Sequence, residues 1–229
     1  MRPGSDVLAG AAAWCAPGLA PHVPSLCAPL GISRTLPRGA TGVALTFDDG
    51  PHPQGTPAVL NALAAHDAKA TFFLVGEQVE RHRALAAEIA AAGHGIALHG
   101  HRHRNLQRVT PRALADDLHR AHVLIAEATG VAPTVYRPPY GIFTPAGLRI
   151  ARREGWEPML WSRWGKDWRA HTRPQTIARR LTTGVVGGDV LLLHDADHYS
   201  ARDSWRRTVA ALPIVLSELD RRGLRSIAL

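Results

Sequence analysis

Long apolar runs, internal repeats and low-complexity tracts are all missing from this sequence of 229 residues. A membrane-spanning helix needs roughly 18–20 consecutive apolar residues. No segment reaches that length, so no membrane span is predicted. With 45% hydrophobic and 20% charged residues, the composition is typical of a globular protein and excludes a disordered chain. A chain of this length is expected to form one well-buried domain.

Cysteine is scarce, and Cys15 and Cys27 are the two examples. They lie in a segment rich in proline and glycine, where they can form a disulfide in an oxidising compartment or stay free. The sequence leaves both alternatives open. The start of the chain partly resembles a signal peptide, but Asp6 and glycines interrupt its short apolar run. We expect residues 1–40 to form an N-terminal extension that covers part of the fold or touches a membrane surface.

Lysine is almost absent, since Lys69 and Lys166 are the only two. Arginine therefore provides nearly all of the 27 basic residues, which exceed the 19 acidic ones and give a net charge of +8. This charge attracts polyanions such as nucleic acid, anionic lipid or acidic cell-wall polymer. However, no basic cluster alternates with aromatic residues as in a nucleic-acid-binding module, so no nucleic-acid partner is expected.

Two adjacent carboxylates, Asp48 and Asp49, follow the apolar, β-favouring run at residues 43–47, and Gly50 and Pro51 then end the strand. Neighbouring buried carboxylates raise each other's pKa unless a cation neutralises them, so a positive partner is expected. Successive side chains of a strand point to opposite sides, which lets one aspartate face a metal and the other a proton. A strand followed by an ordinary polar turn is the alternative.

Two histidines, His99 and His103, follow a second apolar run at residues 95–98. On a helical turn their spacing places both imidazoles on one face, as in metalloprotease zinc sites. A solvated basic loop is the alternative, and the nearby aspartate pair favours a metal site instead. With a carboxylate, the histidines would form an N,N,O set that suits Zn²⁺ best, although Co²⁺ or Ni²⁺ could substitute.

Strand and helix patterns alternate from residue 42 onward, which predicts a parallel sheet. The expected strands cover residues 43–47, 70–75, 95–98, 134–137, 157–161, 189–194 and 224–228. Seven βα units predict a closed or nearly closed α/β barrel. Three helices are expected to begin at Thr-Pro pairs, and four to end at glycine. These residues are Thr56-Pro57, Thr110-Pro111 and Thr144-Pro145, and Gly93, Gly130, Gly155 and Gly223.

Polar residues follow several of these strands, and in such barrels active sites lie at the C-terminal ends of the strands. The aspartate pair follows the first expected strand, the histidine pair the third, residues 137–140 the fourth and Asp167 the fifth, and His194 ends the sixth. Residues that are dispersed in the sequence are therefore expected to converge on one rim. This convergence indicates an enzyme.

Five short motifs of this sequence, in this order, resemble those of the polysaccharide deacetylase (NodB-homology) family of carbohydrate esterases. They are Thr46-Phe47-Asp48-Asp49-Gly50-Pro51, the histidine cluster, Arg137-Pro138-Pro139-Tyr140, Asp167-Trp168 and Leu192-Leu193-His194. The resemblance spans residue 42 to the C-terminus. It implies a distorted (β/α) barrel with about seven strands, and it divides the chain into an extension (residues 1–40) and a catalytic domain (residues 41–229).

The resemblance also implies roles for the polar residues. Asp48 is then the general base and Asp49 a metal ligand with His99 and His103. Arg137 would keep the base ionised. His194 fits the general acid that an amide leaving group needs, and the resemblance implies that Asp167 orients it.

The remaining candidates would contact the substrate. The resemblance assigns the backbone N–H of Tyr140 to the negative charge of the tetrahedral intermediate, and Pro138 stiffens the approach to it. Trp164, Trp168 and Leu192 are expected to line the acetyl or sugar pocket, whereas Trp161 is assigned to packing. The chain departs from the family pattern at Gly100, where Ser or Thr is usual, and at Trp164, where an acid is common.

The predicted function is metal-dependent removal of N-acetyl groups from a glycan that contains N-acetylglucosamine, such as peptidoglycan or chitin-like oligomers. Deacylation of a small molecule or an O-acetyl ester is one alternative, and a catalytically weak glycan-binding module is another. A monomer is expected, associated with the cell wall or a membrane surface through its basic charge. The cell envelope or the extracellular space is the favoured location.

Overall fold

A computed structural model describes residues 16–229 of the protein. Its strands are β1 (Val43–Asp48), β2 (Thr71–Leu74), β3 (Gly95–Leu98), β4 (Val135–Tyr136), β5 (Glu157–Pro158), β6 (Arg163–Trp164), β7 (Val190–His194) and β8 (Ser226–Ile227). Seven of them follow the order β5-β4-β3-β2-β1-β7-β6, and β8 pairs with β1 beside this path. All these strand pairs are parallel. The predicted α/β barrel with about seven parallel strands is confirmed.

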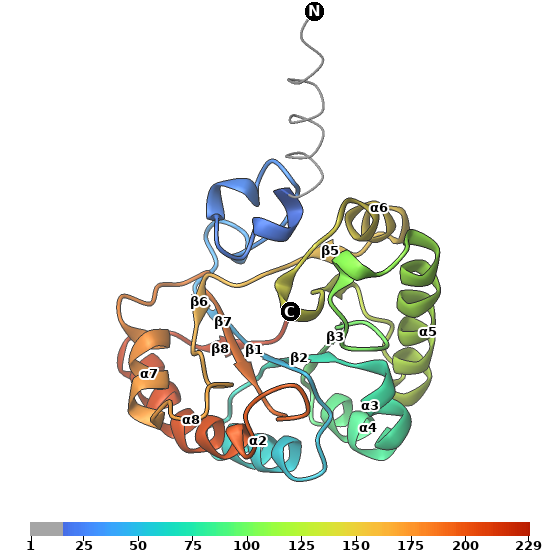
Figure 1. Cartoon of the computed structure of the whole chain (residues 1–229). Helices are drawn as coiled ribbons and strands as arrows, with labels where there is room; N and C mark the ends of the chain where they lie inside the picture. The colour runs from blue at the N-terminus through green and yellow to red at the C-terminus, as the bar shows by residue number, and fades with distance from the viewer. Residues whose placement is uncertain (1–15) are drawn as a thin grey trace, which may run out of the picture.

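Helices surround the curled sheet (Figure 1). They are α2 (Gly55–Ala64), α3 (Gly76–Arg81), α4 (Arg83–Ala91), α5 (Pro111–Thr129), α6 (Pro145–Glu154), α7 (Pro174–Thr182) and α8 (Ser204–Arg221), with short 3-10 turns η1 (Pro24–Leu26), η2 (Leu106–Arg108) and η3 (Pro139–Gly141). Neighbouring helices pack in the order α7, α8, α2, α4, α5, α6. The central strand β1 is buried along its whole length. The apolar core therefore lies between this strand and the helices, and no helix within residues 16–229 is long and apolar enough to cross a membrane.

The strand expected at residues 157–161 is only partly confirmed, because β5 ends at Pro158 and β6 begins beyond the expected range, at Arg163. Strand β5 pairs with β4 at one edge of the sheet, and β6 pairs with β7 at the other. Between them, the carbonyl groups of Met159 and Leu160 accept hydrogen bonds from Arg137, and the carbonyl of Trp161 accepts one from Arg34. Arginine side chains thus donate hydrogen bonds to carbonyl groups that, in a continuous strand, would accept hydrogen bonds from a neighbouring strand.

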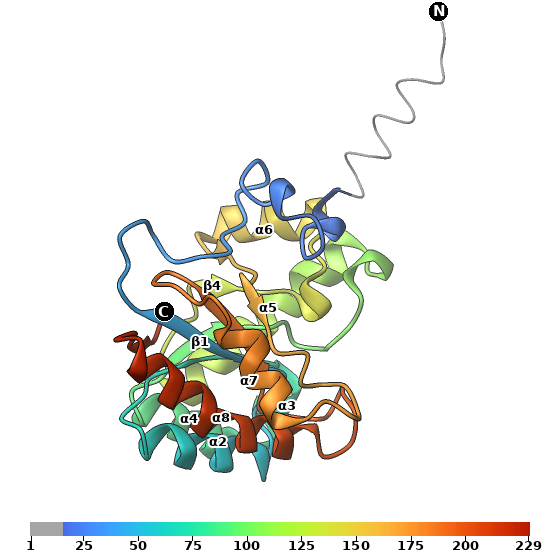
Figure 2. The same cartoon turned by 90° about the vertical axis from the view of Figure 1, so that its left-hand side faces the viewer.

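Residues before the first strand close the gap between β5 and β7. Ser33 forms an isolated bridge with Met159, and Thr35 forms one with Asp189. Residues of the expected N-terminal extension therefore help to close the barrel, although none of the described ones belongs to a named strand. This segment, blue in Figure 1, lies against the side of the barrel between β5 and β6, and Figure 2 shows it from a second direction. Cys27 is buried and free, whereas Cys15 lies outside the described residues.

Two of the three predicted Thr-Pro helix starts are confirmed. Thr110 and Thr144 each accept a hydrogen bond at the side-chain oxygen from the helix N-terminus. The third prediction is wrong, because α2 begins one residue earlier, at Gly55. The hydroxyl of Thr56 instead accepts a hydrogen bond from the backbone N–H of His52 and donates one to Asp195. The four glycines expected at helix ends all adopt positive φ there.

Candidate active site

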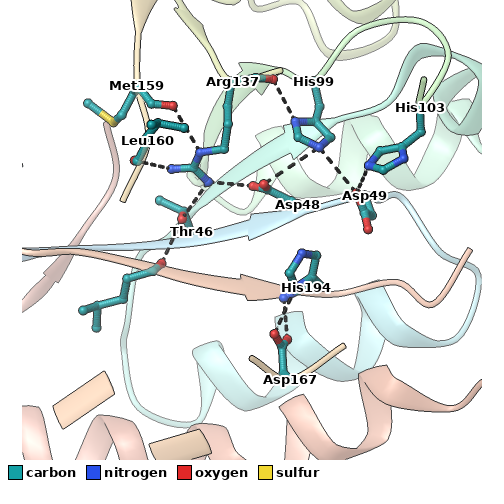
Figure 3. Close-up of polar contacts among 11 residues, drawn as sticks. Thr46, Asp48, Asp49, His99, His103, Arg137, Met159, Leu160, Asp167 and His194 are labelled. Atoms are coloured by element: carbon teal, nitrogen blue, oxygen red, sulfur yellow. Dashed lines mark hydrogen bonds and ion pairs between the residues drawn. The ribbon is translucent and has the colours of Figure 1, made fainter. Parts of the chain in front are cut away.

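A buried ion pair occupies the C-terminal end of β1. The Nη1 atom of Arg137 donates to Asp48 Oδ1 at 2.6 Å and to Thr46 Oγ1 at 3.0 Å (Figure 3). The guanidinium is fully buried, and its other N–H groups bond the carbonyls of Met159 and Leu160. Because a buried charge is costly without partners, this saturated arrangement fixes both side chains. The contact expected between Asp48 and Arg137 is therefore present.

Asp49, His99 and His103 form a cluster whose ligand atoms all lie within 4.8 Å of one another. Asp49 Oδ1 lies 3.4 Å from His99 Nε2 and 3.2 Å from His103 Nε2. This oxygen is buried and has no hydrogen-bond partner among residues 16–229. His99 Nδ1 lies 2.8 Å from the carbonyl of Arg137, which can only accept, so Nδ1 carries the proton and Nε2 keeps its lone pair. The donor set fits a divalent cation.

The pKa of Asp49 agrees with this arrangement. Burial raises the pKa, but the polar and charge interactions with the neighbouring imidazoles of His103 and His99 outweigh burial and hold the pKa well below its usual value. Asp49 is therefore anionic at neutral pH, as a metal-ligating carboxylate must be.

The histidine pair lies in a loop after β3, not on a helical turn, so the helical interpretation of its spacing is wrong. The loop is held by Asp117 of α5, whose Oδ2 accepts from the backbone N–H of His101 at 2.8 Å. Its Oδ1 accepts from Arg104 Nη2 at 2.7 Å. Gly100 has a φ of 84°, where the Ser or Thr usual in the family pattern would be strained. Asp117 thus shapes the loop, although its sequence position showed only an ordinary helix residue.

His194 ends β7 and is the register partner of Asp48 on β1. Asp167 accepts from its Nδ1 at 2.9 Å and from its backbone N–H at 2.7 Å, and the Thr208 hydroxyl also donates to Asp167 at 2.7 Å. Burial lowers the pKa of His194, but the charge and hydrogen bond of Asp167 outweigh burial and raise it to about 10. The imidazole is therefore protonated at neutral pH. Asp167 follows β6 and not the fifth strand as expected.

These polar groups open into one cavity of about 580 Å³. Its lining residues are Gly18, His22, Asp48, Asp49, His99, His103, Asn105, Arg108, Tyr140, Gly141, Ile142, Trp161, Trp164, Trp168, Leu192, His194, Tyr199 and Ser200. The rings of Trp164 and Trp168 stack at 4.7 Å between centroids. Aromatic faces beside a cluster of charged groups suit a sugar ring that carries a polar substituent.

A sequence model of a known family, described as polysaccharide deacetylase, matches residues 36–159, more than half of the chain. The chain belongs to the polysaccharide deacetylase family. It is 32% identical over 198 residues to a peptidoglycan-N-acetylglucosamine deacetylase of Bacillus cereus, covering 86% of this chain and 90% of the relative. It is 35% identical over 192 residues to a chitooligosaccharide deacetylase of Bradyrhizobium, covering 81% and 87%.

A solved structure extends this similarity to three dimensions. It is a peptidoglycan N-acetylglucosamine deacetylase in complex with 4-naphthalen-1-yl-N-oxidanyl-benzamide, with a TM-score of 0.81 and 30% identity, covering 87% of this chain and 91% of that one. Polysaccharide deacetylases are metal-dependent hydrolases that act on the carbon–nitrogen bond of N-acetyl groups. The predicted family and enzyme class are therefore confirmed.

The deacetylase cavity contains most of the predicted substrate residues but not all of them. Tyr140, Trp164, Trp168 and Leu192 line it, whereas Pro138 is buried and is not among the lining residues. Trp161 is 4% exposed and belongs to the apolar core, which confirms its assignment to packing, and it also lines the cavity.

Several residues that line the cavity belong to no sequence motif that indicates a functional role. Gly18 and His22 come from the segment before the first strand, Asn105 and Arg108 from the turn η2 and its N-cap, and Tyr199 from the loop after β7. The tertiary structure places them at the cavity, and the local sequence gives no indication of this position.

Proposed function

We propose that this deacetylase removes N-acetyl groups from a glycan that contains N-acetylglucosamine, either peptidoglycan or chitin-like oligomers. One observation carries the proposal. The Asp49–His99–His103 cluster, the Asp48–Arg137 pair and the His194–Asp167 pair all meet at a single aromatic-lined cavity. The two relatives described above are named for these two kinds of substrate.

Asp49, His99 and His103 would hold the metal, with Zn²⁺ preferred and Co²⁺ or Ni²⁺ as substitutes. A bound divalent cation supplies polarisation of the substrate carbonyl and acidification of a water molecule. The uncommitted Asp49 Oδ1 and the Nε2 atom of His99 support this assignment.

We assign the acid–base steps to Asp48 and His194, each of which forms an ion pair. Asp48, which forms a buried ion pair with Arg137, accepts the proton of the attacking water as the new carbon–oxygen bond forms. His194 then donates its proton to the amide nitrogen, so that the carbon–nitrogen bond breaks with acetate and a free amine as products. Asp167 stabilises the charged imidazole before that transfer.

The substrate would be held by groups around these pairs. The backbone N–H of Tyr140 would face the negative charge of the tetrahedral intermediate. Trp164 and Trp168 would stack on the sugar, and Leu192 would contact the acetyl group. Pro138 is buried and precedes the turn η3, which contains Tyr140. It would therefore act only by stiffening this turn.

Acetate release from peptidoglycan, chitin oligomers and acetylated xylan tests the proposal. The wild-type chain should release acetate from the first two in a zinc-dependent manner. Asp48→Asn should keep zinc but lose roughly 10²–10⁴-fold in turnover, as expected for a general base. Asp49→Asn should lose zinc affinity, and excess zinc should partly restore its activity.

The alternatives predict other results. Preferred release from xylan or from small esters would favour the ester deacylase, and binding without acetate release would favour a glycan-binding module. If the Asp48 variant lost metal while the Asp49 variant kept it, the two roles would have to be exchanged.

We also propose a domain division and a setting for the reaction. Residues 1–40 form the N-terminal extension and residues 41–229 the catalytic domain, which acts as a monomer. The net charge of +8 would draw the protein to an anionic cell wall or membrane surface. The cell envelope or the extracellular space is the location that fits this substrate.

A further inference from the structure

The two histidines of the proposed metal site are held in different ways. His99 donates from Nδ1 to the carbonyl of Arg137, which fixes the orientation of its ring. His103 has no such bond, because its Nδ1 atom is buried and has no hydrogen-bond partner among the residues that the structure describes. Metal-ligating histidines almost always donate this second N–H to an oxygen atom. Something else must therefore orient the ring of His103.

The ring of Tyr199 lies flat against the His103 imidazole. The two centroids are 4.1 Å apart, and the planes differ by 7°. Tyr140 contacts the same imidazole by an edge, at 4.5 Å and 68°. The parallel contact covers one face of the imidazole and prevents the ring from turning about its χ2 angle.

Tyr199 is itself anchored at its far end. Its hydroxyl donates to Glu77 Oε1 at 2.6 Å and accepts from Gln78 Nε2 at 2.9 Å, and both partners lie in the first turn of α3. The loop after β7, which carries Tyr199, is thus tied to a helix that follows β2. A ring that is fixed at one end by two hydrogen bonds presents a rigid surface to His103 at the other.

We propose that Tyr199 is a positioning residue of the metal site. Its anchored ring replaces the missing hydrogen bond of His103 and keeps Nε2 directed at Asp49, 3.2 Å away. This inference rests on the metal site assigned under the proposed function. It predicts that the ring of Tyr199 governs metal affinity although no atom of Tyr199 binds the metal.

Zinc affinity, measured by competition with a chelator, tests the proposal directly. Tyr199→Leu should weaken zinc binding by about 10–100-fold, the usual loss when an outer support of a metal ligand is removed. Tyr199→Phe keeps the ring but loses the hydroxyl hydrogen bonds with Glu77 and Gln78. The zinc affinity of this variant should therefore lie between those of the leucine variant and the wild type. The absorption spectrum of the Co²⁺-loaded protein should change in the leucine variant, because the imidazole then reaches the metal at another angle.

Two measurements separate this role from a structural one. The melting temperature without metal should be similar in wild type and variants. Tyr140→Leu, which removes an edge contact to the same ring, should reduce zinc affinity less than Tyr199→Leu. If the leucine variant does not fold, Tyr199→Met removes the ring with less loss of volume and gives the same readout.

Equal zinc affinity and an unchanged Co²⁺ spectrum in Tyr199→Leu would overturn the inference. Equal losses in the leucine and phenylalanine variants would also overturn it, because the hydroxyl contacts and not the ring would then matter. A wild-type chain that binds no zinc would instead defeat the proposed metal site. The two failures are therefore distinguishable.

Discussion

At the scale of single residues, the proposed proton donor His194 depends on a carboxylate, Asp167, that is held by several hydrogen bonds. Asp167 is completely buried, and it accepts two hydrogen bonds from His194 and one from Thr208. This carboxylate cannot rotate away without leaving donors unsatisfied. It therefore both orients the imidazole and keeps it charged.

Removal of the acid should affect amides more than esters. His194→Ala should lower turnover on N-acetyl substrates by roughly 10²–10⁴-fold and leave zinc stoichiometry unchanged. Esters with good leaving groups need less protonation and should lose less. Parallel kinetics on both substrate types check this, and equal losses would indicate a structural role for His194. Asp167→Asn should weaken the same step, and its effect should largely disappear in the His194→Ala background.

If His194 is the general acid, the same pair should set the alkaline limit of activity. His194 loses its proton as the pH rises through its pKa of about 10, so the acid form is present at all lower pH values. Asp167→Asn removes the charge that raises this pKa, and the alkaline limb of the rate profile should therefore move to lower pH. A pH profile of kcat for both proteins measures the shift, and coinciding alkaline limbs would contradict it.

At the scale of elements, the segment before β1 belongs to the cavity. Gly18 and His22 are among its lining residues. A Cβ atom at Gly18 would lie 2.8 Å from Gln107 Nε2, so the segment packs closely on the turn η2. The ring of His22 lies 6.2 Å from that of Trp164. This segment thus forms a wall of the cavity, while the proposed catalytic groups come from the barrel.

His22→Ala should widen that wall without touching the chemistry. We expect a higher KM for chitin oligomers, with a length dependence that differs from wild type, and an unchanged kcat and zinc content. Kinetics on oligomers of increasing length provide the measurement. His119→Ala is a suitable control, because this exposed histidine of α5 is not among the cavity-lining residues. Unchanged KM values at every length would show that the wall does not contact substrate.

At the scale of the whole molecule, a buried histidine links stability to pH. Burial, aided by Lys69, lowers the pKa of His94 from 6.5 to about 4. The unfolded chain therefore binds more protons than the folded chain between these two values. Stability contributed by neutral His94 is complete above about pH 6.5, and it is lost as the pH falls toward 4.

His94→Asn should flatten this dependence. Asparagine can keep the acceptor for the backbone N–H of Ala70, which bonds His94 Nδ1 at 3.3 Å, but it does not titrate. The difference in unfolding free energy between pH 7 and pH 4 should shrink by an amount on the order of 3 kcal/mol, since one pKa unit corresponds to about 1.4 kcal/mol. Urea denaturation at several pH values measures it. Parallel curves for the two proteins would refute the assignment.

The sequence by itself determined the alternation of strands and helices, except for the short strand β6, and the identity of the central polar residues. Apolar runs, and the glycine and proline residues that end them, involve only a few neighbouring positions, so they can be recognised in the linear sequence. Because consecutive parallel strands end at one rim, the placement of Asp48, the histidine pair, Arg137 and His194 followed from that pattern. The family motifs added the division of roles between them.

Only the tertiary structure decided how these residues are supported. Asp117, Thr208 and Tyr199 reach the site across many sequence positions, and the patterns around them are those of ordinary helices and loops. The break between β5 and β6 likewise depends on Arg34 and Arg137, which lie far from it in the chain. Such contacts are selected by packing and by the need to satisfy buried polar groups, which local propensity does not encode. The closing of the barrel by residues 33–35 has the same origin.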